Sequence, residues 1–184
     1  NMATLFVDKI DPQSGTSLEI GSSGDTFALG SGVVQSNLMY PAFKSYMSAN
    51  QTLSDNTWTK INFDTEAFDT DSMYDTSTYR FTPTVAGKYF VYSVILFESL
   101  TATRIEYANA SIYKNGSSEI RTTAVYSADN VSWQAGGVIS TVVEFNGSSD
   151  YVESYGRIKT FSGSNKIASS DSTYSVFGAY RIGS

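Results

Sequence analysis

The chain has 184 residues, a net charge of −6 and neither cysteine nor histidine. The missing cysteine excludes disulfides and cysteine-ligated metals, and the missing histidine excludes Ser-His-Asp catalysis and imidazole metal sites. The 12 basic residues are scattered among 18 acidic ones, so nucleic acid and anionic membranes are poor partners. No apolar run is long enough for a membrane helix, and the abundant Tyr, Phe, Ser and Thr favour an all-β fold.

The first 36 residues differ from the rest. Residues 3–10 alternate as a strand, residues 11–15 are turn-forming, and short apolar fragments follow between glycine- and serine-rich pieces. Fragments this short bury little alone, so a flexible linker is one interpretation, and a small intertwined β stem is the one we favour. We therefore predict an attachment or stem segment, residues 1–36, and a head, residues 37–184.

The head is predicted to consist of strands separated by polar turns. Two Asn-Gly pairs, at 115–116 and 146–147, are typical of tight hairpins and predict that the strands flanking each pair are neighbours. The number and spacing of the strands fit a two-sheet jelly roll. We expect strands over 42–48, 58–63, 79–82, 88–98, 104–114, 118–127, 137–145, 151–159 and 174–182.

The most apolar run of the chain is KYFVYSVILF, residues 88–97, which only Lys88 and Ser93 interrupt. A run of this kind predicts a strand buried on both faces. One face would pack on the core of a sandwich, and a partner subunit is the simplest cover for the other. We expect an interface between subunits that contains Tyr89, Val91, Tyr92, Val94, Phe177 and Tyr180.

Several short motifs follow one another at characteristic spacing. In order they are Pro41-Ala42-Phe43, Ile61-Asn62-Phe63-Asp64, Tyr74-Asp75 with Phe81, Gly87-Lys88-Tyr89, Tyr113-Lys114-Asn115-Gly116 and Phe177-Gly178-Ala179-Tyr180. Each is weak alone, but together they resemble the C1q/TNF-like jelly-roll family over about residues 41–182. The resemblance implies an all-β, two-sheet antiparallel jelly-roll sandwich that assembles as a homotrimer.

The phrase VDKIDPQSG, residues 7–15, is similar to one found near the start of tail and fibre proteins of marine bacteriophages. No Gly-X-Y collagen run accompanies the jelly roll, in contrast to animal C1q proteins. This resemblance implies a trimeric fibre or knob on the surface of a phage virion. Residues 1–36 would bind other tail or capsid proteins, and the head would serve host attachment or decoration. A secreted C1q-like lectin or ligand and a polysaccharide-active enzyme are the alternatives.

Residues 127–134 place one of the two tryptophans among small polar residues. An indole face stacks on sugar C–H groups, while nearby amides and carboxylates bind hydroxyls. The alternative is that Trp133 caps the sandwich or fills a subunit contact. The candidate residues for binding a host-surface glycan are Asp129, Asn130, Trp133 and Gln134.

Carboxylates gather between residues 64 and 75, a stretch that contains no basic residue. Carboxylate oxygens are the ligands that Ca²⁺ prefers, but the EF-hand glycine is absent. We expect a solvated loop and no cofactor, with a Ca²⁺ site as the alternative. Its ligands would be Asp64, Glu66, Asp69 and Asp71.

Asp150 and Glu153 form a carboxylate pair of the kind that glycosidases use. An acidic β protein offers such pairs by chance, and no local motif marks this one. We therefore expect no enzymatic activity.

Overall fold

The structure, a computed structural model, describes residues 10, 12–15, 20–22, 26, 31, 41–100, 104–125, 132–161, 166–170 and 173–183. The chain divides into two units, residues 1–36 and 37–184. The predicted β stem lies largely outside the described residues and stays a prediction. Within the described ranges, no helix is long and apolar enough to cross a membrane.

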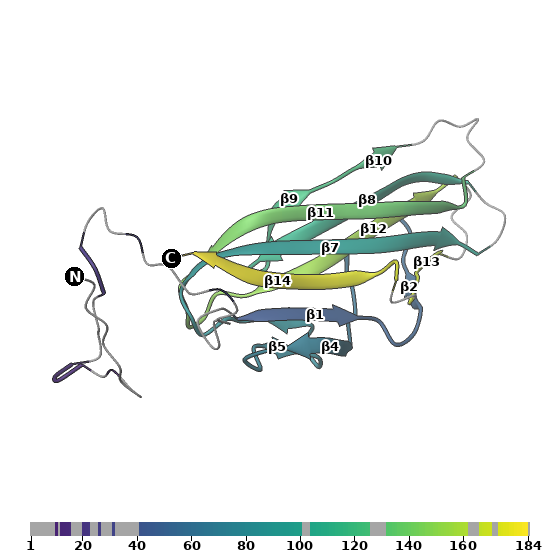
Figure 1. Ribbon diagram of the computed structural model, residues 1–184. Helices are drawn as coiled ribbons and strands as arrows, with labels where there is room; N and C mark the ends of the chain where they lie inside the picture. The colour runs from purple at the N-terminus through teal and green to yellow at the C-terminus, as the bar shows by residue number, and fades with distance from the viewer. Residues whose placement is uncertain are drawn as a thin grey trace. The chain divides into compact units, whose positions relative to one another are not determined.

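The described residues of the second unit form two antiparallel sheets, which confirms the predicted all-β sandwich (Figure 1). Sheet A contains β1 (Ala42–Tyr46), β2 (Gln51–Leu53), β4 (Thr65–Asp69), β7 (Gly87–Ser99), β11 (Gln134–Phe145), β13 (Lys166–Ala168) and β14 (Val176–Gly183). Sheet B contains β3 (Thr59–Lys60), β5 (Tyr74–Asp75), β6 (Arg80–Phe81), β8 (Ile105–Lys114), β9 (Ser117–Arg121), β10 (Ala124–Val125) and β12 (Val152–Thr160).

In sheet A, β7 is the central strand. It pairs with β11 along one edge and with β13 and β14 along the other, and β14 pairs in turn with β1. In sheet B, β8 pairs with β12 on one side and with β9 and β10 on the other. Each sheet is therefore organised around its longest strands.

The two Asn-Gly pairs play different roles. Asn115 and Gly116, with φ of 51° and 78°, close the predicted hairpin between β8 and β9. The predicted hairpin at 146–147 is wrong, because β11 pairs with β7 in sheet A and β12 pairs with β8 in sheet B. Asn146 Oδ1 accepts hydrogen bonds from the backbone N–H groups of residues 148–150 and bends the chain as it crosses between the sheets.

An aromatic cluster joins the two sheets. Phe43 of β1 stacks on Tyr74 of β5 and Phe81 of β6, with ring centroids 4.6 and 4.5 Å apart. It also meets Phe177 of β14 edge-on at 5.1 Å. All four rings are buried. Aromatic pairs in these geometries contribute about 0.5–1.5 kcal/mol each beyond the area they bury, so this cluster is a principal contact between the sheets.

Phe97 of β7 fits between two glycines that belong to opposite sheets. A Cβ built at Gly137 of β11, or at Gly156 of β12, would lie only 2.8 Å from its ring. Nearby, the hydroxyls of Ser93 and Ser154 share a buried hydrogen bond of 2.7 Å across the sandwich. The two sheets therefore approach closely here because these positions carry no side chain or a small one.

Gly137→Ala is expected to lower the free energy of unfolding by about 1–3 kcal/mol, because the added methyl group overpacks the core against Phe97. Gly136→Ala is the matched control, since no atom lies within 4 Å of a Cβ at that outward position. We expect the control to change stability by less than about 0.5 kcal/mol. Urea unfolding at equal protein concentration measures both, and equal stability of the two variants would contradict this packing.

Candidate functional site

The side chains of β7 alternate between the core and the outer face of sheet A. Tyr89 and Val91 have no exposed surface, and neither has Phe177 of β14. These three residues pack between the sheets and are not available to a partner subunit, which corrects the predicted interface. Their neighbours Tyr92, Val94 and Tyr180 lie on the outer face, so their role in an interface stays a prediction.

The outer face of sheet A carries an apolar surface that spans three paired strands. Phe90 lies opposite Val142 on one side and Tyr180 on the other, because β7 pairs with both β11 and β14. By the same pairing, Val94 lies opposite Val138 and Val176. We call this surface the apolar face, and define it by Phe90, Tyr92, Val94, Leu96, Val138, Val142, Val176 and Tyr180.

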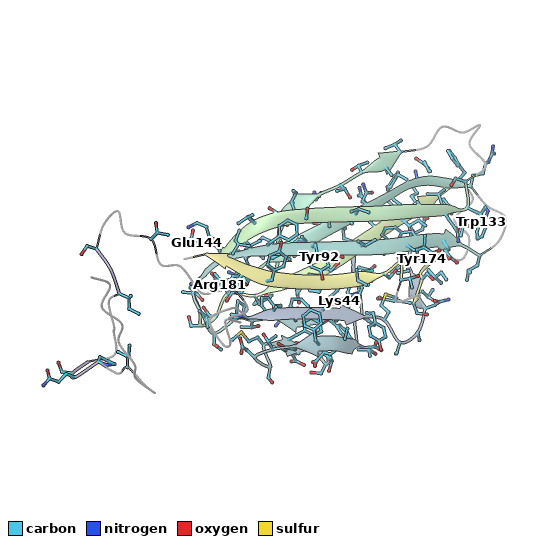
Figure 2. The ribbon with its side chains drawn as sticks, in the orientation of Figure 1. Lys44, Tyr92, Trp133, Glu144, Tyr174 and Arg181 are labelled. Carbon is cyan, nitrogen blue, oxygen red and sulfur yellow. The ribbon has the colours of Figure 1, made fainter. Side chains whose placement is uncertain are left out.

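Tyr92 lies at the centre of the apolar face (Figure 2). Its ring covers Gly178, where a Cβ would come within 2.5 Å of the ring carbon that carries the hydroxyl. Burial raises the pKa of the Tyr92 hydroxyl, with a smaller contribution from Tyr180. The phenol lies against the sheet over Gly178, where another apolar surface can contact it.

The contribution of β11 to this face was not among the sequence-based predictions. Val138 and Val142 are 64% and 48% exposed in the protomer. The signal was the apolar pairs Val138-Ile139 and Val142-Val143. Because successive side chains of a strand point to opposite faces, such pairs place apolar groups on both faces of β11.

Trp133, just before β11, borders a hollow at one end of the sandwich. The hollow has a volume of about 380 Å³ and is lined by Glu98, Ser99, Leu100 and Trp133, whose side chain is 53% exposed. Gln134 Nε2 donates a 3.0 Å hydrogen bond to Glu98 Oε1. Trp133 and Gln134 therefore lie beside Glu98, whereas Asp129 and Asn130 are outside the part of the chain that the structure describes.

One residue that lines the hollow has a buried hydroxyl without a hydrogen-bond partner among the described residues. Ser99 is 3% exposed, and its Oγ makes no hydrogen bond with any described residue. A buried hydroxyl in this state loses the hydrogen bonds that it would make in water. The hollow thus combines an exposed indole face with the Glu98 carboxylate, to which the neighbouring Gln134 amide is hydrogen-bonded.

Two of the predicted calcium ligands, Glu66 and Asp69, lie in strand β4 and not in the expected solvated loop, and Asp64 and Asp69 bind separate partners. Asp64 accepts hydrogen bonds from the backbone N–H and the hydroxyl of Ser48, at 2.7 and 2.6 Å. Burial raises the pKa of Asp64, but these hydrogen bonds lower it by more. The pKa therefore lies below its ordinary value. Asp69 accepts the backbone N–H of Tyr74 at 2.7 Å. Among the described residues, which include Glu66 and Asp71, no three acidic side chains form a group that could hold a metal ion.

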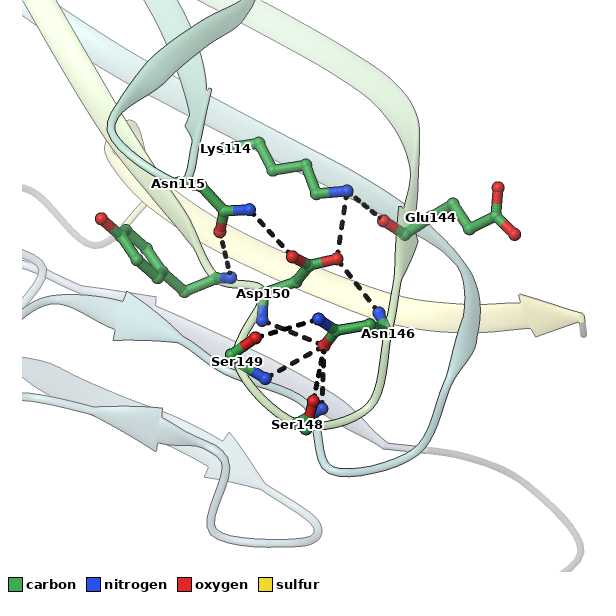
Figure 3. Close-up of polar contacts among 8 residues, drawn as sticks. Lys114, Asn115, Glu144, Asn146, Ser148, Ser149 and Asp150 are labelled. Atoms are coloured by element: carbon green, nitrogen blue, oxygen red, sulfur yellow. Dashed lines mark hydrogen bonds and ion pairs between the residues drawn. The ribbon is translucent and has the colours of Figure 1, made fainter.

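Glu153 and Asp150, the carboxylate pair of the enzyme alternative, belong to separate ion-pair networks. Glu153 is buried and lies 3.2 Å from Lys60 Nζ and 2.8 Å from Arg80 Nε. Asp150 accepts a hydrogen bond from Asn115 Nδ2 at 2.8 Å and lies 3.2 Å from Lys114 Nζ (Figure 3). Both carboxylates are thus held by cations and amides that stabilise the fold.

Comparison with known families identifies the fold family. The C1q domain model matches residues 42–180. The chain belongs to the C1q domain family. C1q/TNF-like domains are generally non-enzymatic ligand domains, and homotrimers are typical of them. The two-sheet sandwich described above is therefore that of a C1q domain.

Solved structures support the same fold. This C1q domain is similar to murine APRIL, with a TM-score of 0.57 and 13% identity over 78% of this chain and 99% of that one. It is also similar to Eiger TNF from S. frugiperda, with a TM-score of 0.59 and 11% identity over 78% of this chain and 93% of that one. The globular domain of the zebrafish complement 1qA protein gives a TM-score of 0.51 and 14% identity over 78% of this chain and 97% of that one. At these identities the likeness concerns the fold alone. Among curated proteins, no sequence matches this chain.

Asp150→Asn is expected to lower the free energy of unfolding at pH 7 by about 1 kcal/mol, through loss of charge-assisted contacts. The hydrogen bond from Asn115 and the ion pair with Lys114 outweigh burial and hold the pKa of Asp150 below its ordinary 3.8. Because the pKa is lowered in the folded state, this stabilisation is present above pH 4 and is lost as pH falls through the folded-state pKa.

Unfolding measured from pH 7 to pH 3 tests this expectation. The stability difference between the native protein and Asp150→Asn should narrow as the pH falls. Asp71→Asn, at an exposed carboxylate, is the control and should change stability little at any pH. A difference that stays constant down to pH 3 would show that the carboxylate charge is not the source of the stabilisation.

Proposed function

We propose that this C1q domain is a homotrimeric, non-enzymatic attachment head, carried on a bacteriophage fibre or knob. The apolar face is the observation that supports assembly. Phe90, Tyr92 and Val94 lie side by side with exposed residues of the neighbouring strands. Monomeric soluble proteins seldom leave contiguous apolar patches of this kind uncovered, and each apolar side chain gains about 1.5–3 kcal/mol when fully buried.

A second and third copy of the chain are the partners that fit this face. On β7, β11 and β14 the rows of Phe90, Tyr92 and Val94 contain no charged residue, and the nearest cation is Lys44 of β1, which pairs with Gly178 at the border of the face. Assembly through these three strands therefore requires no desolvation of an unpaired charge. Homotrimers are typical of the family, and a closed three-fold ring would cover the face on every protomer.

The phage assignment rests on the sequence of residues 7–15. In this proposal residues 1–36 bind tail or capsid proteins and the head remains at the virion surface. The likeness to animal ligand domains supports a second candidate, a C1q-like ligand of a cellular organism. Incorporation of the full chain, but not of residues 37–184, into phage particles would separate the two candidates.

We assign host recognition to the hollow at Trp133. Arg181 N–H donates to the carbonyl of Pro41, so the head begins at the end of the sandwich that carries Arg181. Trp133 lies at the opposite end (Figure 2). A shallow site there would bind one sugar weakly, and three copies on one axis would raise the effective affinity through avidity.

Val138→Asp is expected to convert the trimer into monomers, because it places a charge within the apolar face, opposite Val94. The fold should survive, since this side chain is 64% exposed in the protomer. Val125→Asp is the matched control on sheet B, where Val125 is 71% exposed. Light scattering after size exclusion measures the masses. A trimer that tolerates Val138→Asp, or that is broken equally by Val125→Asp, would contradict the proposed interface.

Trp133→Ala is expected to abolish detectable binding of the full-length protein to neutral oligosaccharides on a glycan array, because the stacking surface is lost. The midpoint of thermal unfolding should change little, since the indole is half exposed. Much earlier melting would instead indicate that Trp133 caps the fold or a subunit contact. Unchanged glycan binding would place recognition elsewhere.

A further inference from the structure

The outer face of sheet B differs in chemistry from the apolar face. Along β12, Val152, Ser154 and Ile158 point into the core and are buried. Tyr155, Arg157 and Lys159 alternate with the buried residues and point outward. This second surface lies on the opposite side of the sandwich, so it stays open when the apolar face is covered.

Most charges on this surface are paired. Glu153 binds Lys60 and Arg80, and Lys159 Nζ lies 2.8 Å from Glu106 Oε2. Arg121 and Arg157 are different, because neither guanidinium has a carboxylate partner among the described residues. In a chain with a net charge of −6, two such cations on one face are a local excess of positive charge.

The two guanidinium groups share one aromatic ring. Arg157 Cζ lies 4.9 Å and Arg121 Cζ lies 5.5 Å from the centroid of Trp58. Arg157 also lies 5.0 Å from the ring centroid of Tyr107. Stacking on aromatic rings restricts the side chains before any ligand arrives, which reduces the entropy lost on binding.

Neutral partners fix the orientation of both groups. Arg121 Nε donates to Ser118 Oγ at 2.8 Å, and Arg157 Nε donates to Asn109 Oδ1 at 3.4 Å. Within the described ranges, no hydrogen bond involves the terminal nitrogens of either residue. These nitrogens form the fork that binds carboxylate, sulfate or phosphate oxygens in a bidentate manner.

We propose that Arg121 and Arg157, held over Trp58, form a binding site for the acidic groups of an anionic polysaccharide. A chain with one acidic group every sugar or two matches two separate cations. Nucleic acid carries a much denser row of charges and needs a longer basic surface. The exposed edges of Trp58 and Tyr107 can contact the sugar rings between the acidic groups. The site is distinct from the hollow at Trp133.

Three polysaccharides test the proposal with the full-length protein. Polygalacturonate supplies carboxylates, dextran sulfate supplies sulfates, and dextran is the neutral control. We expect binding to at least one polyanion in biolayer interferometry and none to dextran. Arg157→Gln should weaken polyanion binding roughly tenfold, and Arg157→Lys should restore only part of it, because lysine keeps the charge but not the fork.

Arg104→Gln is the matched control, because it removes the same charge from an exposed position outside the site. It should change the affinity less than twofold, and Glu119→Gln should raise the affinity, since it removes an exposed carboxylate from the strand of Arg121. Trp133→Ala should leave polyanion binding intact, which separates this proposal from the glycan site above. Thermal unfolding of each variant confirms that it is folded.

Two results would overturn the proposal. The first is the absence of binding to both polyanions. The second is an equal loss of binding in Arg157→Gln and Arg104→Gln, which would indicate attraction to positive charge in general. If only one polyanion binds, the result identifies whether the site prefers carboxylate or sulfate groups.

Discussion

The alternation of side chains along β7 places apolar groups on both sides of sheet A. Inward, Phe97 fits between Gly137 and Gly156 and sets how closely the two sheets approach. Outward, Tyr92 lies flat over Gly178 in the centre of the apolar face. A register shift of one residue would exchange the two sets, so the strand pairing that forms the core also determines the surface offered to a partner.

The two outer faces of the sandwich have different chemistry and suit different partners. The apolar face combines aliphatic side chains with the rings of Phe90, Tyr92 and Tyr180, which suits contact with another protein surface. The outer face of sheet B combines ion pairs with two arginines stacked on Trp58. A homotrimer would bury the first face and present three copies of the second. Assembly and ligand binding could then take place on opposite sides of each protomer without competing.

Sequence patterns predicted the parts of the fold that depend on local rules. The apolar run at 88–97 marked the central strand, and Asn115-Gly116 marked a hairpin because both residues adopt positive φ. The same rule failed at Asn146-Gly147, where side-chain hydrogen bonds bend the chain as it crosses between the sheets and no hairpin forms. The predicted strand at 58–63 is reduced to β3, Thr59–Lys60, and the short strands β2 and β13 were not predicted, because they depend on partners far away in the chain.

Predictions about the candidate sites were weaker, because tertiary structure determines which way a side chain points and which side chains lie close together. A continuous apolar run does not show which residues point inward, so Tyr89, Val91 and Phe177 were assigned to an interface although they fill the core. Trp133 was identified from the polar residues around it in the sequence. The hollow that it shares with Glu98 could not be predicted, because the two residues are far apart in the sequence. The arrangement of Arg121 and Arg157 over Trp58 has no local signature, since the three residues come from separate parts of the chain.

Sedimentation equilibrium of the unmodified full-length protein tests the central claim most directly, because everything proposed for the apolar face requires that copies of the chain cover it. The account predicts a single species with three times the chain mass of 20.0 kDa, across micromolar concentrations. A stable monomer at 20.0 kDa would contradict the account, because the apolar face would then be exposed to water in the native protein.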